Sequence, residues 1–206
     1  MNLFLRAKHW QLFLVTFGLP FLIEIVMMAF IVSKIIEYRD PTIFFNYFRF
    51  FPLIMIIFMG PLLGWQWSIA IGLQRYLPQW VKMNVTQFKV FLIIPIVYII
   101  LILFAVTFLF NTNTQSLDTV NLSAQMGAAF IFIFPVHLFS MFCLFYCVYF
   151  VAKTIKTVEL QRPVSFSEFA GEFFMVWFFP VGVWILQPRI NKIIANPEAL
   201  NINTEI

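Results

Sequence analysis

The sequence predicts an all-α fold, a polytopic bundle of transmembrane helices, and two observations carry that prediction. Of the 206 residues, 62% are hydrophobic and only 11% are charged, whereas about 25% of the residues in a soluble domain are charged. The apolar residues also gather in runs of about twenty, the length of helix that crosses a bilayer. A chain with so little polar material cannot cover a water-facing surface, so we expect one membrane domain over residues 1–206.

Four apolar runs are long enough to cross the membrane as helices. They cover residues 10–33, 50–73, 90–110 and 126–152. At about 1.5 Å per residue, each run reaches across the roughly 30 Å of hydrocarbon in a bilayer. Basic residues precede the first run, as in a signal peptide, but no small-residue cleavage site follows it. We therefore expect an uncleaved first span.

The basic residues between the runs predict the orientation of the chain. The interval 111–125 contains no Lys or Arg, so the positive-inside rule places it outside. The N-terminus and the intervals 74–89 and 153–162 are then cytoplasmic. The interval 34–49 is expected outside despite its basic residues, with its aromatic end, FFNYFRFFP, along the membrane interface. The net charge of +4 is accordingly assigned to topology and lipid head groups, and not to nucleic acid.

The fourth helix is expected to extend beyond the membrane as a cytoplasmic stub. Its residues Lys156, Glu159 and Arg162 are spaced three apart, which suits ion pairing along a helix. The helix should stop before Pro163, because the residue before a proline avoids the helical conformation.

A further helix should start near Phe166. Ser165 and Glu168 form the S-x-x-E pattern of a capping box just before it. The membrane-embedded segment that follows, residues 166–187, is interrupted by a proline and a glycine. It is either a fifth span or a re-entrant or interfacial hairpin, and its length allows both. The polar tail after Asn191 is expected to be loose.

The second run carries the most specific pattern in the chain. Gly60, Gly64, Ser68 and Gly72 recur every four residues, and such a stripe of small residues lets another backbone approach closely. The stripe is either an interface with a partner or a second copy, or a packing face within this chain's own bundle. In both cases we expect protein to cover it.

A polar layer is predicted inside the membrane. Counted along their helices, Glu24, Tyr98 and His137 lie at similar depths, about 14 to 18 Å from the outer boundary. We hypothesise that Glu24 and His137 form a buried pair, either alone or with the Tyr98 hydroxyl as a third member, near backbone carbonyls freed by Pro20 and Pro95. Such a pair serves either as a proton or cation relay or as a structural hydrogen bond.

The sequence indicates no metal centre, cofactor or catalytic residue. Cys143 and Cys147 share a helical face, but His137 lies elsewhere around that helix and no further ligand follows at a suitable spacing. We expect ordinary buried thiols. Glu168 and Glu172 are explained by the favourable position of acids at a helix N-terminus. No glycine-rich phosphate loop or matched nucleophile and base is present in the sequence.

Three stretches of the chain resemble uncharacterised small multi-pass membrane proteins of Bacteroidetes. They are RAKHWQLFLVTFGLP, FFPLIMIIFMG and FFMVWFFPVGVWILQPRIN, the last with its Q-P-R-I-N ending. The resemblance implies a location in the bacterial inner (cytoplasmic) membrane. It implies no activity and supplies no catalytic residues.

Two classes of function remain open from the sequence. The first is a non-catalytic integral membrane subunit or scaffold, in which the face from Gly60 to Gly72 and the cytoplasmic stub bind partners among membrane lipids and proteins, including a second copy. The second is a small transporter or channel that uses the layer of Glu24 and His137. A polar cavity that reaches Glu24 would favour transport, whereas a dry, packed centre with an exposed glycine face would favour a subunit.

Overall fold

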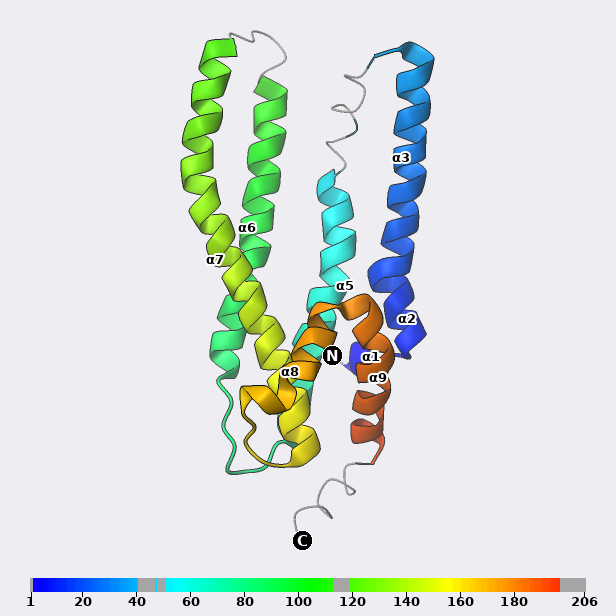
Figure 1. The fold of residues 1–206 in the computed structure, drawn as a ribbon, viewed down its shortest axis with the longest axis vertical. Coiled ribbons are helices and arrows are strands. Elements are labelled where there is room, and N and C mark those ends of the chain that lie inside the picture. Colours follow the sequence, from blue (N-terminus) through cyan, green and yellow to red (C-terminus); the bar gives the residue numbers. More distant parts are fainter. Residues whose placement is uncertain (1, 41–46, 48–50, 113–118, 197–206) are drawn as a thin grey trace. The chain divides into compact units, whose positions relative to one another are not determined.

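The computed structural model is all-α over the residues that it describes, which are 2–40, 47, 51–112 and 119–196 (Figure 1). No strand occurs in this part of the chain, and the predicted fold class is confirmed. Residues 44–46 and 48–50 of the expected interfacial stretch FFNYFRFFP lie outside the described residues, as does the centre of the outer interval 111–125.

The described chain is a succession of helices. They are α1 (Asn2–Arg6), α2 (His9–Phe13), the π-helix η1 (Leu14–Gly18), α3 (Leu19–Tyr38), α5 (Phe51–Gly72), the 3-10 helix η2 (Leu73–Tyr76), α6 (Val85–Thr112), α7 (Thr119–Leu160), α8 (Phe166–Trp177) and α9 (Phe179–Ala195). Among the described residues, four stretches are long and apolar enough to cross a membrane. They are His9–Tyr38, Leu53–Tyr76, Val85–Ala105 and Ile133–Leu160.

The first of these stretches contains a widened turn just before Pro20. Proline has no N–H, so the carbonyl of Thr16 loses its usual donor four residues later. The π-helix η1 lies at this point and bonds the Leu19 N–H to the Leu14 carbonyl. The Thr16 hydroxyl is buried and donates to the Leu12 carbonyl at 2.6 Å. The chain therefore accommodates the proline by a local change of helix type.

The helices form two compact units. Unit 1 contains residues 1–85 and 148–206, and unit 2 contains residues 86–147. Helix α7 is continuous and contributes its first part to unit 2 and its second part to unit 1.

Unit 2 is an antiparallel pair made by α6 and the first part of α7 (Figure 1). The Phe91 ring contacts the rings of Phe142 and Tyr146, with centroids 6.2 and 4.7 Å away. Further along α6, Tyr98 contacts His137. Residue numbers rise on one helix as they fall on the other, which fixes the antiparallel direction.

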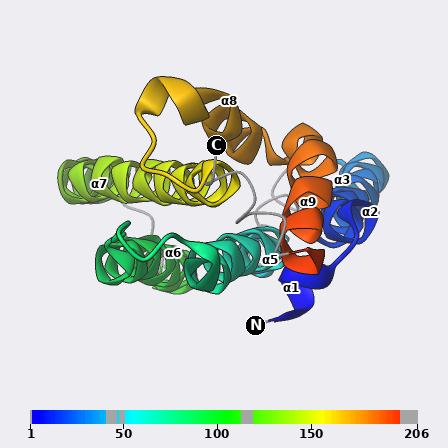
Figure 2. The same ribbon diagram turned by 90° about the horizontal axis from the view of Figure 1, so that it is seen from below.

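Unit 1 is built around α5. Helix α1 packs against α5 and α9, α2 packs against α9, and α3 packs against α5 (Figure 2). The core of the unit is formed by large apolar side chains from α5, η2, α8 and α9 that are removed from the surface. These fully buried side chains include Trp65, Ile69, Leu73, Phe169, Leu186 and Ile190.

Helix α8 begins with the capping box that the sequence predicted. Its first residue is Phe166, and the Glu168 carboxylate accepts a hydrogen bond from the Ser165 backbone N–H at 2.8 Å. Helix α7 ends at Leu160, before Pro163, also as expected. Both predictions depended on local sequence signals, and both are confirmed.

Helices α8 and α9 form a hairpin. The chain turns at Phe178, and Gly182 comes so close to α8 that an ideal Cβ there would lie 1.8 Å from the Met175 carbonyl oxygen. Helix α8 has 12 residues and α9 has 17, about 18 and 25 Å, so each is shorter than the roughly 30 Å of hydrocarbon. The chain therefore reverses direction at Phe178, and how deeply residues 166–187 enter a membrane stays a prediction. Helix α9 also continues to Ala195, so the first residues of the expected loose tail are helical.

Candidate functional site

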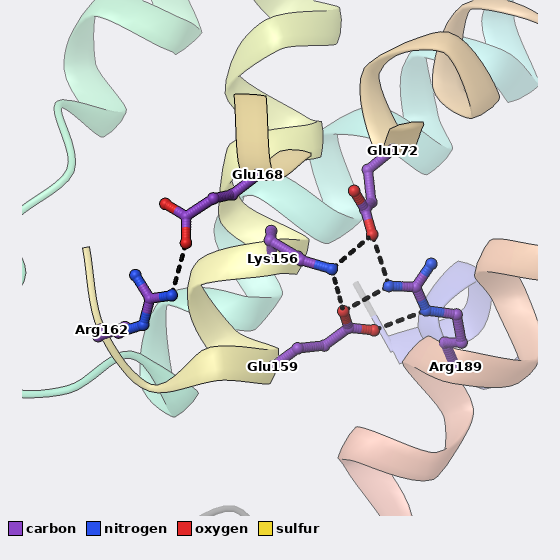
Figure 3. Close-up of polar contacts among 6 residues, drawn as sticks. All are labelled: Lys156, Glu159, Arg162, Glu168, Glu172 and Arg189. Atoms are coloured by element: carbon purple, nitrogen blue, oxygen red, sulfur yellow. Dashed lines mark hydrogen bonds and ion pairs between the residues drawn. The ribbon is translucent and has the colours of Figure 1, made fainter. Parts of the chain in front are cut away.

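Four charged side chains from three helices meet in unit 1, and we name them the ion cluster. Lys156 and Glu159 project from α7, Glu172 from α8 and Arg189 from α9 (Figure 3). The sequence placed the first two on the stub that follows the fourth span. It did not predict that the other two join them.

Arg189 links the two carboxylates of the ion cluster. Its Nε donates to Glu159 Oε1 at 2.7 Å, and its Nη2 donates to Glu159 Oε2 and, at 2.6 Å, to Glu172 Oε1. The Lys156 Nζ lies 3.2 Å from Glu172 Oε1 and 4.0 Å from Glu159 Oε2. Two cations therefore balance two anions, and the cluster has no net charge.

Glu172 is the most buried member of the cluster, with 6% of its side chain exposed. It lies on the same face of α8 as the buried residues Phe169 and Val176, three and four residues away. Burial by itself raises the pKa of the Glu172 carboxyl, but hydrogen bonds from Arg189 and Lys156 outweigh it, so that the pKa is lowered. Burial likewise opposes the charge of Arg189, but the two carboxylates raise the pKa of its guanidinium.

A second ion pair fixes the start of α8. Arg162 Nη2 donates to Glu168 Oε1 at 2.5 Å (Figure 3). The backbone hydrogen bond from Ser165, together with the Arg162 guanidinium, lowers the pKa of Glu168 to about 2. The Glu168 carboxylate therefore caps the N-terminus of α8 and also pairs with Arg162 in the loop before it.

The sequence predicted that Arg162 pairs along the stub, with Glu159, and this prediction is wrong. Lys156 does pair with Glu159, but Arg162 pairs with Glu168. The reason is the end of α7, where Gln161 has a left-handed backbone with φ of 50°. A left-handed residue ends a helix and redirects the chain, so Arg162 leaves the face that Glu159 occupies.

Gln187, on α9, is fully buried and holds the end of α1. Its Oε1 accepts a hydrogen bond from Trp65 Nε1 at 2.9 Å, and its Nε2 lies 3.1 Å from Asn191 Oδ1. Asn191 Nδ2 donates to the Ala7 carbonyl at 3.1 Å. Gln187 Nε2 also lies within 3.2 Å of the carbonyl oxygens of Phe4, Leu5 and Ala7. The last carbonyls of a helix have no partner within it, and these two amides provide one.

The Q-P-R-I-N ending thus has two structural roles. Gln187 and Asn191 are four residues apart on one face of α9. Gln187 contacts α1, and Asn191 contacts Ala7 directly after it. Arg189 lies between them in sequence and belongs to the ion cluster. The segment ties α9 to α1 on one side and to α7 and α8 on another.

The glycine face of α5 packs mainly against α1. The Phe4 ring lies 3.0 Å from an ideal Cβ at Gly64, and Leu5 Cδ1 lies 2.3 Å from one at Gly72. Between them, Ser68 is buried and its hydroxyl donates to the Gly64 carbonyl at 2.8 Å. Three of the four positions therefore pack within the chain, which was one of the two alternatives. At the fourth, Gly60, no described atom beyond its chain neighbours and the adjacent backbone of its own helix lies within 4 Å of an ideal Cβ.

The expected polar layer forms in part. The Tyr98 hydroxyl lies 2.9 Å from His137 Nδ1, within unit 2. Glu24 is exposed on α3 and not buried, because α3 packs along only a narrow side that buries Pro20 and Ile31. No hydrogen bond or ion pair joins Glu24 to another residue of the described chain. The pairing of Glu24 with His137, which belongs to the other unit, stays a prediction.

The described residues contain no group of three or more His, Cys, Asp or Glu side chains that could hold a metal ion. Cys143 and Cys147 are buried free thiols on α7. Each charged group of the ion cluster lies within 4.0 Å of an opposite charge. The cluster is therefore suited to holding α7, α8 and α9 together. Comparison of the chain with models of protein families, with curated proteins and with solved structures finds no match.

Proposed function

We propose that the protein is a non-catalytic integral membrane subunit or scaffold that binds a transmembrane helix of a partner through α3. The observation that carries the proposal is the exposed carboxyl of Glu24, which lies midway along the candidate span His9–Tyr38. We also propose, from the distribution of basic residues and the resemblance described above, that the protein lies in a bacterial inner membrane with its N-terminus in the cytoplasm.

An acidic side chain at this position is costly without a partner. Placing a charged group at the centre of a membrane helix costs about 2.5 to 3.5 kcal/mol or more. A protonated carboxyl avoids the charge but still needs a hydrogen-bond partner, because hydrocarbon offers none. A partner helix that supplies a basic side chain or a hydrogen-bond donor at the same depth removes this cost.

The surroundings of Glu24 suit a helix–helix contact. One turn away on the same side of α3 lie Phe21 and Met28, and both are exposed. These three residues define the α3 face. The charged groups of the ion cluster are already used in tying the chain's own helices, so the α3 face is the better docking surface.

The proposal is tested by photo-crosslinking in native membranes. A photoreactive residue is placed at Phe21 or Met28, on the α3 face, and at Leu22 or Val26, which lie about 160 to 200° around the helix from Glu24. All four positions are exposed, which makes the last two matched controls. We expect one discrete heavier adduct from the α3 face only, reduced at least fivefold when Glu24→Leu is added.

Two outcomes would contradict the proposal. Equal adducts from both sides of α3, or an adduct that Glu24→Leu leaves unchanged, would mean that the carboxyl plays no part in recognition. A crosslink within the same chain, without increase in mass, would mean that Glu24 is covered by the protein itself.

A small transporter or channel is the second candidate, and the hydrogen bond between Tyr98 and His137 favours it. Intramembrane histidines and acids are the groups that proton pathways use. The test is proton or cation flux in vesicles that contain the purified protein. Flux that falls more than tenfold in both Glu24→Gln and His137→Ala would support this function and contradict the first.

A further inference from the structure

The tip of the α8–α9 hairpin presents large apolar side chains at its surface. Six residues around the turn are each between 45% and 69% exposed. They are Phe174, Trp177, Phe178, Val181, Trp184 and Ile185. We name them the hairpin tip. Such a cluster of exposed aromatic and branched side chains marks contact with a membrane or a protein.

The opposite end of the hairpin is polar. No charged residue occurs between Glu172 and Arg189, and those two residues belong to the ion cluster. Further from the turn, α8 begins with its cap at Ser165, and α9 carries the exposed Lys192. The hairpin is therefore apolar at its turn and charged at its base, which is the polarity of an element that enters a membrane from one side.

The tip also lies beside membrane-crossing helices of unit 1. The ring of Phe179, next to the turn, packs on Trp65 with centroids 4.9 Å apart, and Trp65 lies midway along the candidate span Leu53–Tyr76. Trp184 packs on His9, where the first candidate span begins, with ring centroids 4.7 Å apart. Figure 1 shows the hairpin, in orange, rising beside α5 and turning partway along it.

The turn is suited to a medium that offers no hydrogen bonds. The Phe178 N–H donates to the Phe174 carbonyl at 2.8 Å, and the N–H groups of Val181 and Gly182 both donate to the Phe178 carbonyl. Pro180 has no N–H to satisfy. Non-helical backbone within a membrane is tolerated where its polar groups are satisfied by the protein.

We infer that the α8–α9 hairpin is a re-entrant membrane element. Its tip enters the hydrocarbon of one leaflet beside α2 and α5, and acyl chains cover the hairpin tip. Both ends of the hairpin leave the membrane on the same side, where the ion cluster lies. The tip continues the apolar surface of α2 and α3, whose exposed side chains face the same hydrocarbon. The inference does not depend on the partner proposed for Glu24.

The first test measures the depth of the tip. Single cysteines at Phe178 or Val181, with Ser167 at the base as the control, are introduced into Cys143→Ala/Cys147→Ala protein and labelled with an environment-sensitive fluorophore. The protein is placed in phosphatidylethanolamine and phosphatidylglycerol vesicles with and without brominated acyl chains. We expect blue-shifted emission at the tip and at least threefold stronger quenching by the brominated lipid than at Ser167.

The second test measures on which side each end lies. Cysteines at Ser167 and Lys192, both exposed, are treated with a membrane-impermeant maleimide in intact spheroplasts and in inverted vesicles. Labelling of both positions from the same side is expected. Labelling from opposite sides would make the segment a fifth span and would overturn the inference.

The two remaining outcomes also overturn it. A tip label with unshifted emission and no quenching would place the hairpin in water. A blue-shifted tip label that brominated lipid does not quench would mean that a protein, and not acyl chains, covers the hairpin tip.

Discussion

At the residue scale, the least expected feature is the buried carboxylate of Glu172. Its desolvation opposes the charged form, and two cations from different helices offset that cost. The net gain from such a cluster is small, but removal of one partner leaves the others buried without compensation. The cluster therefore makes the chain sensitive to single charge changes.

We predict that Arg189→Gln lowers the free energy of unfolding by about 3 to 5 kcal/mol, because Glu159 and Glu172 then both lose their hydrogen bonds from the Arg189 guanidinium. Lys192→Gln, an exposed change on the same helix, should stay within about 0.5 kcal/mol. Thermal and denaturant unfolding in detergent measures both. Equal stability of the two variants would show that the ion cluster does not hold the hairpin.

The pH dependence follows from the lowered pKa values of two acids. The pKa of Glu172 lies below its usual 4.5, and that of Glu168 lies at about 2. A carboxyl with a depressed folded-state pKa contributes stability above its unfolded-state pKa and loses it as pH falls through the folded-state value. We expect the melting temperature in detergent to fall below about pH 4.5, and Glu172→Gln to flatten the upper part of that fall. A melting temperature that rises on acidification would contradict the assignment.

At the element scale, the hairpin is defined by one close approach. Proline and glycine in residues 166–187 are compatible with a kinked span and with a reversal, and the sequence does not distinguish these outcomes. The packing of Gly182 on the Met175 carbonyl does distinguish them, because only a chain that folds back brings these atoms together. A position of this kind tolerates no side chain without backbone movement.

Gly182→Ala should accordingly lower the free energy of unfolding by about 1 to 3 kcal/mol or more, since the added methyl meets backbone and not a movable side chain. Gly171→Ala is the matched control on α8. No described atom lies within 4 Å of an ideal Cβ there, and the change should be neutral or add up to about 1 kcal/mol. Denaturant unfolding in detergent compares them, and a neutral Gly182→Ala would argue against the tight reversal.

At the scale of the whole molecule, composition and local signals predicted the fold class, the end of α7 and the start of α8. They did not predict the role of Gln187, whose partners on α1 and at Ala7, just after it, lie 180 to 183 residues away in sequence. Nor did they predict α1, because the basic residues before the first apolar run indicate only a flank of that span. A helix of five residues has no periodicity of its own, and its stability comes from packing. The burial of Glu172 could have been predicted from the sequence, because its spacing from Phe169 and Val176 places it on the buried face of α8.

The junction of α1 with α5 and α9 gives the last prediction. Leu5 is 2% exposed and fills the space over Gly72, whereas Leu3, on the same helix, is 79% exposed. Leu5→Ala should cost about 2 to 5 kcal/mol, and Leu3→Ala should stay within about 0.5 kcal/mol. The two variants are compared by thermal unfolding in detergent, and equal losses would contradict the docking of α1.

The contact between Gln187 and α1 also sets the order in which the protein can assemble during synthesis. Helix α1 is made before α9, yet the amides that bind the carbonyls at its end are on α9. At about 5 to 20 residues per second, α1 waits roughly 10 to 40 seconds for them. Chains that stop before Gln187 lack both amides, so the α1 carbonyls gain these hydrogen bonds only after α9 has been made.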